Sequence, residues 1–223
     1  IAAFLAWHRA NALPQYIRLL NDANARFARG VSQEDLVWGY DSLQAQVLQA
    51  VRAGAGEIAD LLDRLTPEQL AYMERRFVED NRKYAREQLA GSLDERRKRR
   101  LKRNVERLQE WFGELSEAQV QLVKRYADHA PLTEGMRERE RKRLQAEFLA
   151  IVRAREAKAR LAEWAVQWER RREPEHAAAA RAQRMEYFAM LVELNKTLTP
   201  GQRQATEMRI RELVTDFERL SRK

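Results

Sequence analysis

Apolar residues recur at helical spacing through almost the whole chain, and this periodicity constrains the fold more than any other feature. Stripes spaced i, i+3 or i+4, i+7 return in segment after segment, as at Leu101, Val105 and Leu108. No stretch of the sequence alternates with period two over the length of a strand between turn signals. The pattern therefore predicts an all-α chain with essentially no β-sheet.

The residue types agree with this periodicity. The 223 residues include only 8 Gly and 5 Pro, and 44% of positions are hydrophobic while 34% are charged. Such a chain can bury a core, but it is too charged for a thick multilayered globule. We expect an elongated antiparallel helical bundle or cradle of about seven helices. The expected domain is single and covers residues 1–223, with sub-bundles 1–130 and 131–223 as a further division.

Proline and glycine predict where helices break. Pro14 predicts a break or kink within the first helix. Gly54 and Gly56 predict a bend or a close helix crossing in the second. The longest predicted helix covers residues 134–172 and would be roughly 60 Å long. Pro174 ends it.

One pattern, Leu-Ser/Thr-x-x-Gln, occurs at three predicted helix starts. The three copies are Leu65, Thr66 and Gln69; Leu115, Ser116 and Gln119; and Leu198, Thr199 and Gln202. In each copy the hydroxyl group is placed to cap the helix, and the Gln three positions later is placed to complete a capping box. The pattern is thus a helix-start device on physical grounds, and its repetition leaves a further role open.

The formal net charge of +8 is concentrated in two short segments. Residues 94–103 hold seven Lys or Arg and two acids, and residues 137–143 hold five and two. The rest of the chain sums to zero, so the charge forms two local patches rather than a field over the whole molecule. The candidate basic patch consists of Arg96, Arg97, Arg99, Arg100, Arg103 and Arg107.

The basic patch has three interpretations. It can form a solvated face with acidic partners on neighbouring helices, bind anionic lipid headgroups or acidic client segments, or contact a nucleic-acid backbone. The sequence contains no recognisable nucleic-acid-binding module and no aromatic residues interleaved with the basic run. We therefore expect no specific binding of nucleic acid.

The sequence offers no candidate catalytic or metal-binding residues. The chain has no cysteine, which excludes a thiol nucleophile, a disulfide framework and a cysteine-ligated metal. His8, His129 and His176 are far apart in the sequence. No glycine-rich phosphate loop or Gly-x-Ser-x-Gly elbow occurs. We expect a binding protein rather than an enzyme, with no cofactor and no metal.

Three tryptophans, Trp111, Trp164 and Trp168, are candidate apolar binding residues. Trp164 and Trp168 lie one helical turn apart and therefore share a face. Buried packing is the ordinary role of such side chains. On an exposed concave face they would form a surface for client proteins, because aromatic side chains dominate interface energies.

The three Leu-Ser/Thr-x-x-Gln copies resemble the motif of the Spy-like periplasmic chaperones, small helical cradles that hold partly unfolded clients. A broader similarity is to an uncharacterised family of proteobacterial lipoproteins. It is carried by residues 6–9, 13–16, 95–103 and 106–108, by Trp111 and by the first two motif copies. In that family an export signal, a lipidated cysteine and a short aromatic and acidic segment precede the Ala-Trp-His-Arg stretch. The resemblance implies a periplasmic protein tethered to the outer membrane through an N-terminal lipidated cysteine that this sequence lacks.

We therefore expect a periplasmic lipoprotein that binds partly folded or envelope-associated proteins without enzymatic activity. The first alternative is a structural or regulatory scaffold for one envelope partner. A lipase foldase ranks lower because no stretch resembles the Arg-x-x-Phe-Asp-Tyr motif of that family, and a nucleic-acid binder ranks last. No run of about 18 apolar residues and no signal peptide occurs, while the sequence opens inside a helical pattern, as a chain cut after its anchor would.

Overall fold

The computed structural model describes residues 2–222, which form helices and no strand, and this confirms the predicted all-α fold class. The α-helices are α1 Ala2–Trp7, α2 Leu13–Ala28, α3 Gln33–Leu62, α4 Pro67–Tyr84, α5 Leu93–Phe112, α6 Glu117–His129, α7 Glu134–Arg153, α8 Ala157–Gln167, α9 Pro174–Lys196 and α10 Pro200–Ser221. Two π-helical turns, His8–Ala12 and Ala85–Leu89, follow α1 and α4. Within these residues, no helix combines the length and the apolar character needed to cross a membrane.

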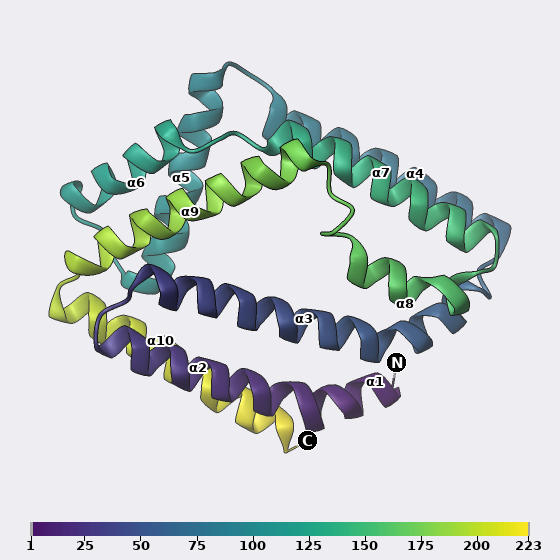
Figure 1. Ribbon diagram of the computed structural model, residues 1–223, viewed down its shortest axis with the longest axis horizontal. Coiled ribbons are helices and arrows are strands. Elements are labelled where there is room, and N and C mark those ends of the chain that lie inside the picture. Colours follow the sequence, from purple (N-terminus) through teal and green to yellow (C-terminus); the bar gives the residue numbers. More distant parts are fainter. Residues whose placement is uncertain (1, 223) are drawn as a thin grey trace.

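The helices are arranged as a frame (Figure 1), and the middle of this frame is hollow. Along one side, α2 packs against α3 and α10, while α4 packs against α7 on the opposite side. At one end α5 packs against α6, and α9 contacts both α6 and α3. The short helix α8 turns back from α7 and packs against α3. Helices far apart in the sequence therefore border the same central space.

Two separate hydrophobic cores hold this frame together. The first joins α2, α5, α6 and α9 and includes the fully buried Val123 and Leu194. The second joins α3, α7 and α8 and includes Ile151 and Val152. Apolar burial, the dominant stabilising contribution to folding, is thus concentrated at the two ends of the molecule. The middle can remain open because neither core depends on filling it.

The three predicted helix starts are confirmed. Thr66, Ser116 and Thr199 each accept a backbone N–H bond from the Gln three residues later, whose side chain in turn accepts the N–H of the cap residue. The same reciprocal arrangement occurs at Ser32 with Asp35 and at Ser92 with Glu95. Because a capping box involves residues only three positions apart, it can be recognised from the sequence.

Two of the predicted helix irregularities are also present. The chain makes the π-helical turn His8–Ala12 directly before α2, so the missing N–H of Pro14 falls in the first turn of a new helix. Helix α3 continues through Gly54, where an added Cβ would lie 3.2 Å from the Phe4 ring. Gly54 therefore marks the predicted close helix crossing, and α1 is the partner helix.

The predicted single helix over residues 134–172 is wrong. Helix α7 ends at Arg153, and Arg155 adopts a left-handed conformation with φ of 59°. The Asp63 carboxylate at the end of α3 then accepts the N–H groups of Ala157 (3.0 Å) and Lys158 (3.2 Å), which caps α8. Asp63 lies more than 90 residues before Ala157 in the sequence, so no local sequence pattern predicts this cap. The turn folds α8 back against α3 and α7.

Candidate functional site: a central hollow lined by aromatic and arginine side chains

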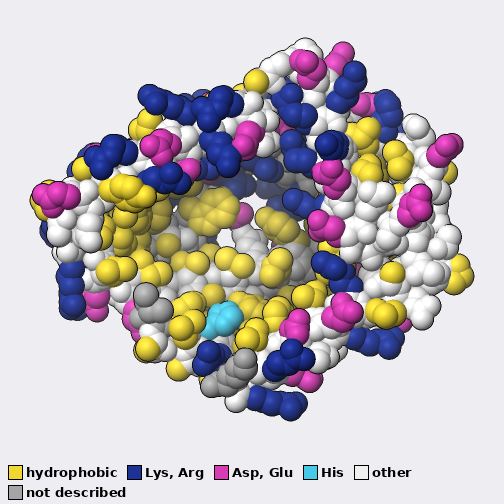
Figure 2. Space-filling model, turned by 180° about the vertical axis from the view of Figure 1, so that it is seen from behind, with side chains coloured by type: hydrophobic (Ala, Val, Ile, Leu, Met, Phe, Trp, Pro, Cys, Tyr) yellow, Lys and Arg dark blue, Asp and Glu magenta, His cyan; other side chains and the backbone are white. Residues whose placement is uncertain are grey.

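A hollow of about 1260 Å³ lies between α3, α4, α5, α6, α7, α8 and α9. Figure 2 shows a concavity from behind, with hydrophobic side chains gathered over its interior and Lys and Arg along part of its rim. The volume exceeds the roughly 300–1,000 Å³ of an ordinary small-molecule site. The space is therefore large enough for part of another macromolecule.

Aromatic side chains form much of the lining of the hollow. They are Tyr40, Phe77, Tyr126, Phe148, Trp164, Trp168, Tyr187 and Phe188. Phe148 links two of its neighbours, because its ring lies 6.3 Å from that of Phe77 and 5.7 Å from that of Trp164, centre to centre. Such edge-to-face and tilted pairs add stability beyond the area they bury. We call this set the aromatic wall.

Four arginines that line the hollow, Arg107, Arg137, Arg141 and Arg184, make up what we call the arginine quartet. They come from three helices: α5, α7 and α9. Among the described residues, no acidic side chain forms a salt bridge with any of the four. The quartet therefore brings positive charge to the hollow that has no direct acidic partner in the described part of the chain.

Three members of the quartet, Arg137, Arg141 and Arg184, are held by contacts that leave their charge in place. The Arg184 guanidinium lies 4.1 Å from the centre of the Tyr40 ring, and that of Arg141 lies 5.8 Å from the centre of the Tyr84 ring. These are cation–π contacts. Arg137 donates a hydrogen bond of 3.1 Å to the Gln183 side-chain oxygen. The aromatic and amide partners orient the guanidinium groups without neutralising them.

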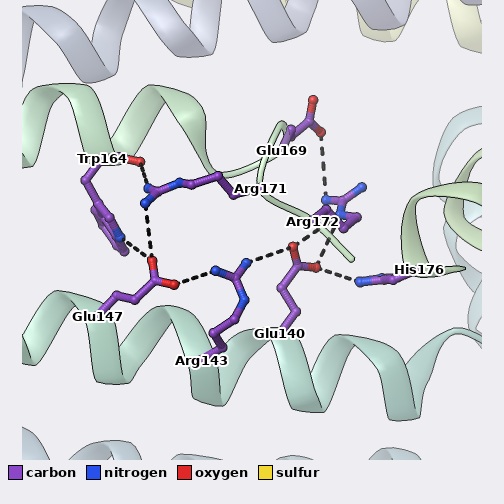
Figure 3. Close-up of polar contacts among 8 residues, drawn as sticks. All are labelled: Glu140, Arg143, Glu147, Trp164, Glu169, Arg171, Arg172 and His176. Atoms are coloured by element: carbon purple, nitrogen blue, oxygen red, sulfur yellow. Dashed lines mark hydrogen bonds and ion pairs between the residues drawn. The ribbon is translucent and has the colours of Figure 1, made fainter. Parts of the chain in front are cut away.

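The two glutamates that line the hollow are, in contrast, already paired (Figure 3). Glu140 Oε2 lies 2.8 Å from His176 Nδ1 and 3.2 Å from Arg172 Nε. Glu169 accepts a hydrogen bond from Gln44 and pairs with Arg172 at 3.9 Å. The two glutamates therefore already have partners within the protein, and the electrostatic potential in the hollow is positive.

A second part of the same network fixes the position of Trp164 (Figure 3). Trp164 Nε1 donates to Glu147 Oε2 at 2.9 Å, and Arg171 donates to the Trp164 carbonyl oxygen at 3.0 Å. Burial alone would raise the pKa of Glu147, but hydrogen bonds from Trp164 and Arg143 outweigh it and hold that pKa below its usual range. Glu147 is therefore ionised at neutral pH and keeps the indole ring on the aromatic wall.

His176 is buried at the start of α9, with 3% of its surface exposed. Burial is the main cause that lowers the pKa of His176 below its usual 6.5, and Arg172 acts in the same direction while Glu140 opposes it. The imidazole is therefore neutral at neutral pH. Protonation would place a positive charge on a buried imidazole, where the charged form is less stable than it is in water.

We expect the protein to become less stable as the pH is lowered, because of His176. In the unfolded chain the His176 imidazole takes up a proton near pH 6.5, and in the folded chain it does so only at lower pH. The stabilisation is therefore fully present above about pH 6.5 and is lost as the pH falls from there toward the depressed folded pKa. Urea unfolding midpoints at about pH 7 and about pH 5 measure the loss. In His176→Gln, which cannot titrate, the fall should be smaller, and an equal fall in both proteins would contradict the assignment.

The residues of the basic patch do not form one surface. Arg100 is 3% exposed and donates to the carbonyl oxygens of Ala130 (2.7 Å) and Pro131 (2.8 Å). Arg96 pairs with Glu134 of α7 at 3.2 Å, and Arg100 also pairs with Glu134.

The other patch residues are divided in a similar way. Arg97 pairs with Asp94, and Arg99 donates to the Ala90 carbonyl oxygen. Arg103 is exposed and does not line the hollow. Of the six residues, only Arg107 lines the hollow.

The structure also separates the three candidate tryptophans. Trp164 and Trp168 line the hollow, and Arg172 lies 4.9 Å from the centre of the Trp168 ring. Trp111 lies outside the hollow on α5, where Arg209 of α10 covers its ring at 5.4 Å. The two tryptophans one turn apart are therefore brought together with the aromatic wall, and Trp111 is not.

Two of the three motif copies contact each other. Gln119 and Gln202 are buried, and each side-chain amide donates to the other's oxygen, at 2.9 Å and 3.0 Å. Gln119 also donates to the Thr197 carbonyl oxygen, and Gln202 to that of Glu114. In the first copy Gln69 is exposed and only caps its helix. The second and third copies thus join the starts of α6 and α10, away from the hollow.

Three members of the arginine quartet, Arg137, Arg141 and Arg184, were not among the predicted site residues. Arg137 and Arg141 belong to the second charged segment, and their i, i+4 spacing continues to Gln145, which also lines the hollow. That spacing was the available signal. Arg184 lies outside both charged segments, and it reaches the hollow only because α9 packs across the frame.

These features define an all-α protein built around an open, basic and aromatic hollow. Over residues 1–176 the sequence matches a family of unknown function, DUF6279, and the chain belongs to that family. No curated protein and no solved structure matches the chain. The match ends at the start of α9, so Arg184, Tyr187 and Phe188 complete the hollow from beyond the matched span.

Proposed function

We propose that this protein is a periplasmic lipoprotein that reversibly holds partly folded or envelope-associated proteins in its central hollow, as a chaperone does. The observation that supports the proposal most is the aromatic wall beside four arginines that lack acidic partners. The similarity to proteobacterial lipoproteins and to the Spy-like motif supports the location and the lipid tether. No cofactor is needed for this mechanism.

The chemistry of the hollow suits reversible holding. Trp, Tyr and Arg are enriched among the residues that contribute most to binding at protein interfaces. Positive charge speeds the capture of a chain of opposite charge, whereas apolar contacts mainly control its release. The aromatic wall and the arginine quartet would therefore act on different steps of one binding cycle.

A scaffold for one specific envelope partner is the second candidate. Surfaces that accept many partners are often flexible and rich in methionine. The lining of the hollow contains no methionine among the described residues, and the network around Glu147 holds Trp164 in one position. A pre-organised wall of this kind favours a single complementary shape.

Suppression of client aggregation tests the proposal. The protein at stoichiometric concentration should slow the aggregation of several unrelated unfolded clients. Trp168→Ala removes an aromatic group from the hollow and should raise the concentration needed by on the order of thirtyfold, because loss of such an anchor typically costs about 2 kcal/mol or more. Light scattering measures the effect.

Trp111→Ala is the matched control, since it makes the same change outside the hollow. It should leave suppression unchanged, provided that circular dichroism shows both variants folded. Equal losses in the two variants would exclude the hollow as the client site. If the unaltered protein suppresses no client, general chaperoning is wrong and the single-partner scaffold becomes the better explanation.

A further inference from the structure

We infer that the hollow selects acidic amphipathic peptide segments, in which carboxylates contact the arginine quartet and neighbouring apolar side chains contact the aromatic wall. This inference rests on the proposed function and narrows its clients. It assigns ligand chemistry to Arg107, Arg137, Arg141 and Arg184, which the fold itself leaves without acidic partners.

Charge complementarity is the first reason. Arg172 engages Glu140, and Gln44 and Arg172 engage Glu169, so both carboxylates of the hollow already have partners within the protein. The Arg141 Nε group is buried and has no hydrogen-bond acceptor. Guanidinium groups bind carboxylates with two parallel hydrogen bonds, and such bonds are stronger where water is partly excluded. A carboxylate arriving with a ligand would pair with guanidinium groups that make no salt bridge within the described part of the fold.

The arrangement of the helices is the second reason. The quartet comes from α5, α7 and α9, whereas α3 and the end of α8 contribute Tyr40, Leu43, Trp164 and Trp168 and no arginine. Phe148, Tyr187 and Phe188 come from the same helices as three of the quartet arginines, and Arg184 lies over the Tyr40 ring, so a segment in the hollow meets arginine and aromatic side chains next to each other. A segment that carries carboxylates beside apolar side chains matches this mixed lining.

The amide groups of the hollow favour a peptide over a lipid chain. Gln145 accepts a hydrogen bond from Asn81, and Asn104 donates one to the Arg100 carbonyl oxygen. The remaining amide donor of Gln145 and the acceptor of Asn104 form no hydrogen bond within the described residues, and both side chains line the hollow. A peptide backbone can pair with such groups, whereas an acyl chain would cover them without a partner.

The test uses fluorescence anisotropy with the whole chain and a labelled, helix-forming peptide that carries Glu on one face and Leu and Phe on the other. A second peptide replaces every Glu with Gln. The Glu peptide should bind on the order of tenfold more tightly or better, and its affinity should fall as salt rises. Equal affinity for the two peptides would overturn the inference.

Two double variants with equal charge changes locate the effect. R107Q/R141Q removes two quartet arginines on α5 and α7 and should weaken binding of the Glu peptide by on the order of tenfold. R103Q/R139Q changes two exposed arginines on the same helices, outside the hollow, and should leave the affinity unchanged. Circular dichroism checks that both are folded. An equal loss in the two variants would contradict the assignment to the quartet.

Vesicles of phosphatidylglycerol and phosphatidylcholine provide the remaining arm. If the protein binds the vesicles, R107Q/R141Q abolishes that binding and the Glu peptide never binds, the hollow is a lipid-binding site and the inference is wrong.

Failure of the proposed function is distinguishable from failure of the inference. A protein that suppresses aggregation but does not discriminate the two peptides retains the function and loses the selectivity, whereas a protein that does neither loses both.

Discussion

Arg100→Gln is expected to destabilise the protein by about 3–5 kcal/mol, the cost of breaking a buried charge pair by removing one partner. The Arg100 guanidinium joins α5 to the start of α7 through two carbonyl oxygens and Glu134. Without it, the Ala130 carbonyl oxygen loses its donor, the Pro131 carbonyl oxygen keeps only the hydrogen bond from Gln183, and the Glu134 carboxylate keeps Arg96 as its partner among the described residues. Urea unfolding followed by circular dichroism measures the change.

Arg103→Gln is the control, because Arg103 is an exposed arginine on the same helix. It should change the stability by less than about 0.5 kcal/mol. If the lost Arg100–Glu134 pair causes much of the destabilisation, Arg100→Gln and Glu134→Gln together should cost less than the sum of the single changes. Equal effects at positions 100 and 103 would show that Arg100 is not structural.

Gln119→Ala is expected to cost about 2–4 kcal/mol, well above the usual effect of losing a helix cap. The substitution removes the reciprocal amide pair with Gln202, the hydrogen bond to the Thr197 carbonyl oxygen and the acceptor of the Ser116 N–H. It also leaves a cavity in a site where Gln119 is 2% exposed. Thermal and urea unfolding both measure this loss.

Gln69→Ala makes the same change in the first motif copy, where the glutamine is exposed and only completes a capping box. The expected loss is about 0.5–1 kcal/mol. The difference between the two variants isolates what the Gln119–Gln202 pair adds beyond capping. Equal losses at positions 69 and 119 would mean that the buried pair contributes nothing to stability.

The helical fold and most helix starts could be predicted from the sequence because their causes are local. A capping box depends on residues three apart, and an apolar stripe depends on a repeat of three or four. The shared face of Trp164 and Trp168 follows from the same spacing, and both line the hollow. Nothing in that spacing distinguished an open hollow from an ordinary core.

Features that depend on distant parts of the chain were not predictable. The end of α7 depends on Asp63, and the burial of Arg100 depends on Glu134 and the chain around Pro131. Each of these partners lies 30 or more residues away along the chain. For the same reason the basic run suggested a continuous surface, although its most buried arginine is part of the internal framework.

The claim that a client occupies the hollow can be tested by thiol footprinting. The sequence has no cysteine, so a single cysteine reports on one position. Ala180 lines the hollow, and Ala182 is exposed on the same helix outside it. We expect an unfolded client to slow alkylation of Ala180→Cys by on the order of tenfold and to leave that of Ala182→Cys unchanged. Unchanged alkylation at position 180 while the client is demonstrably bound, or equal slowing at both positions, would contradict the account.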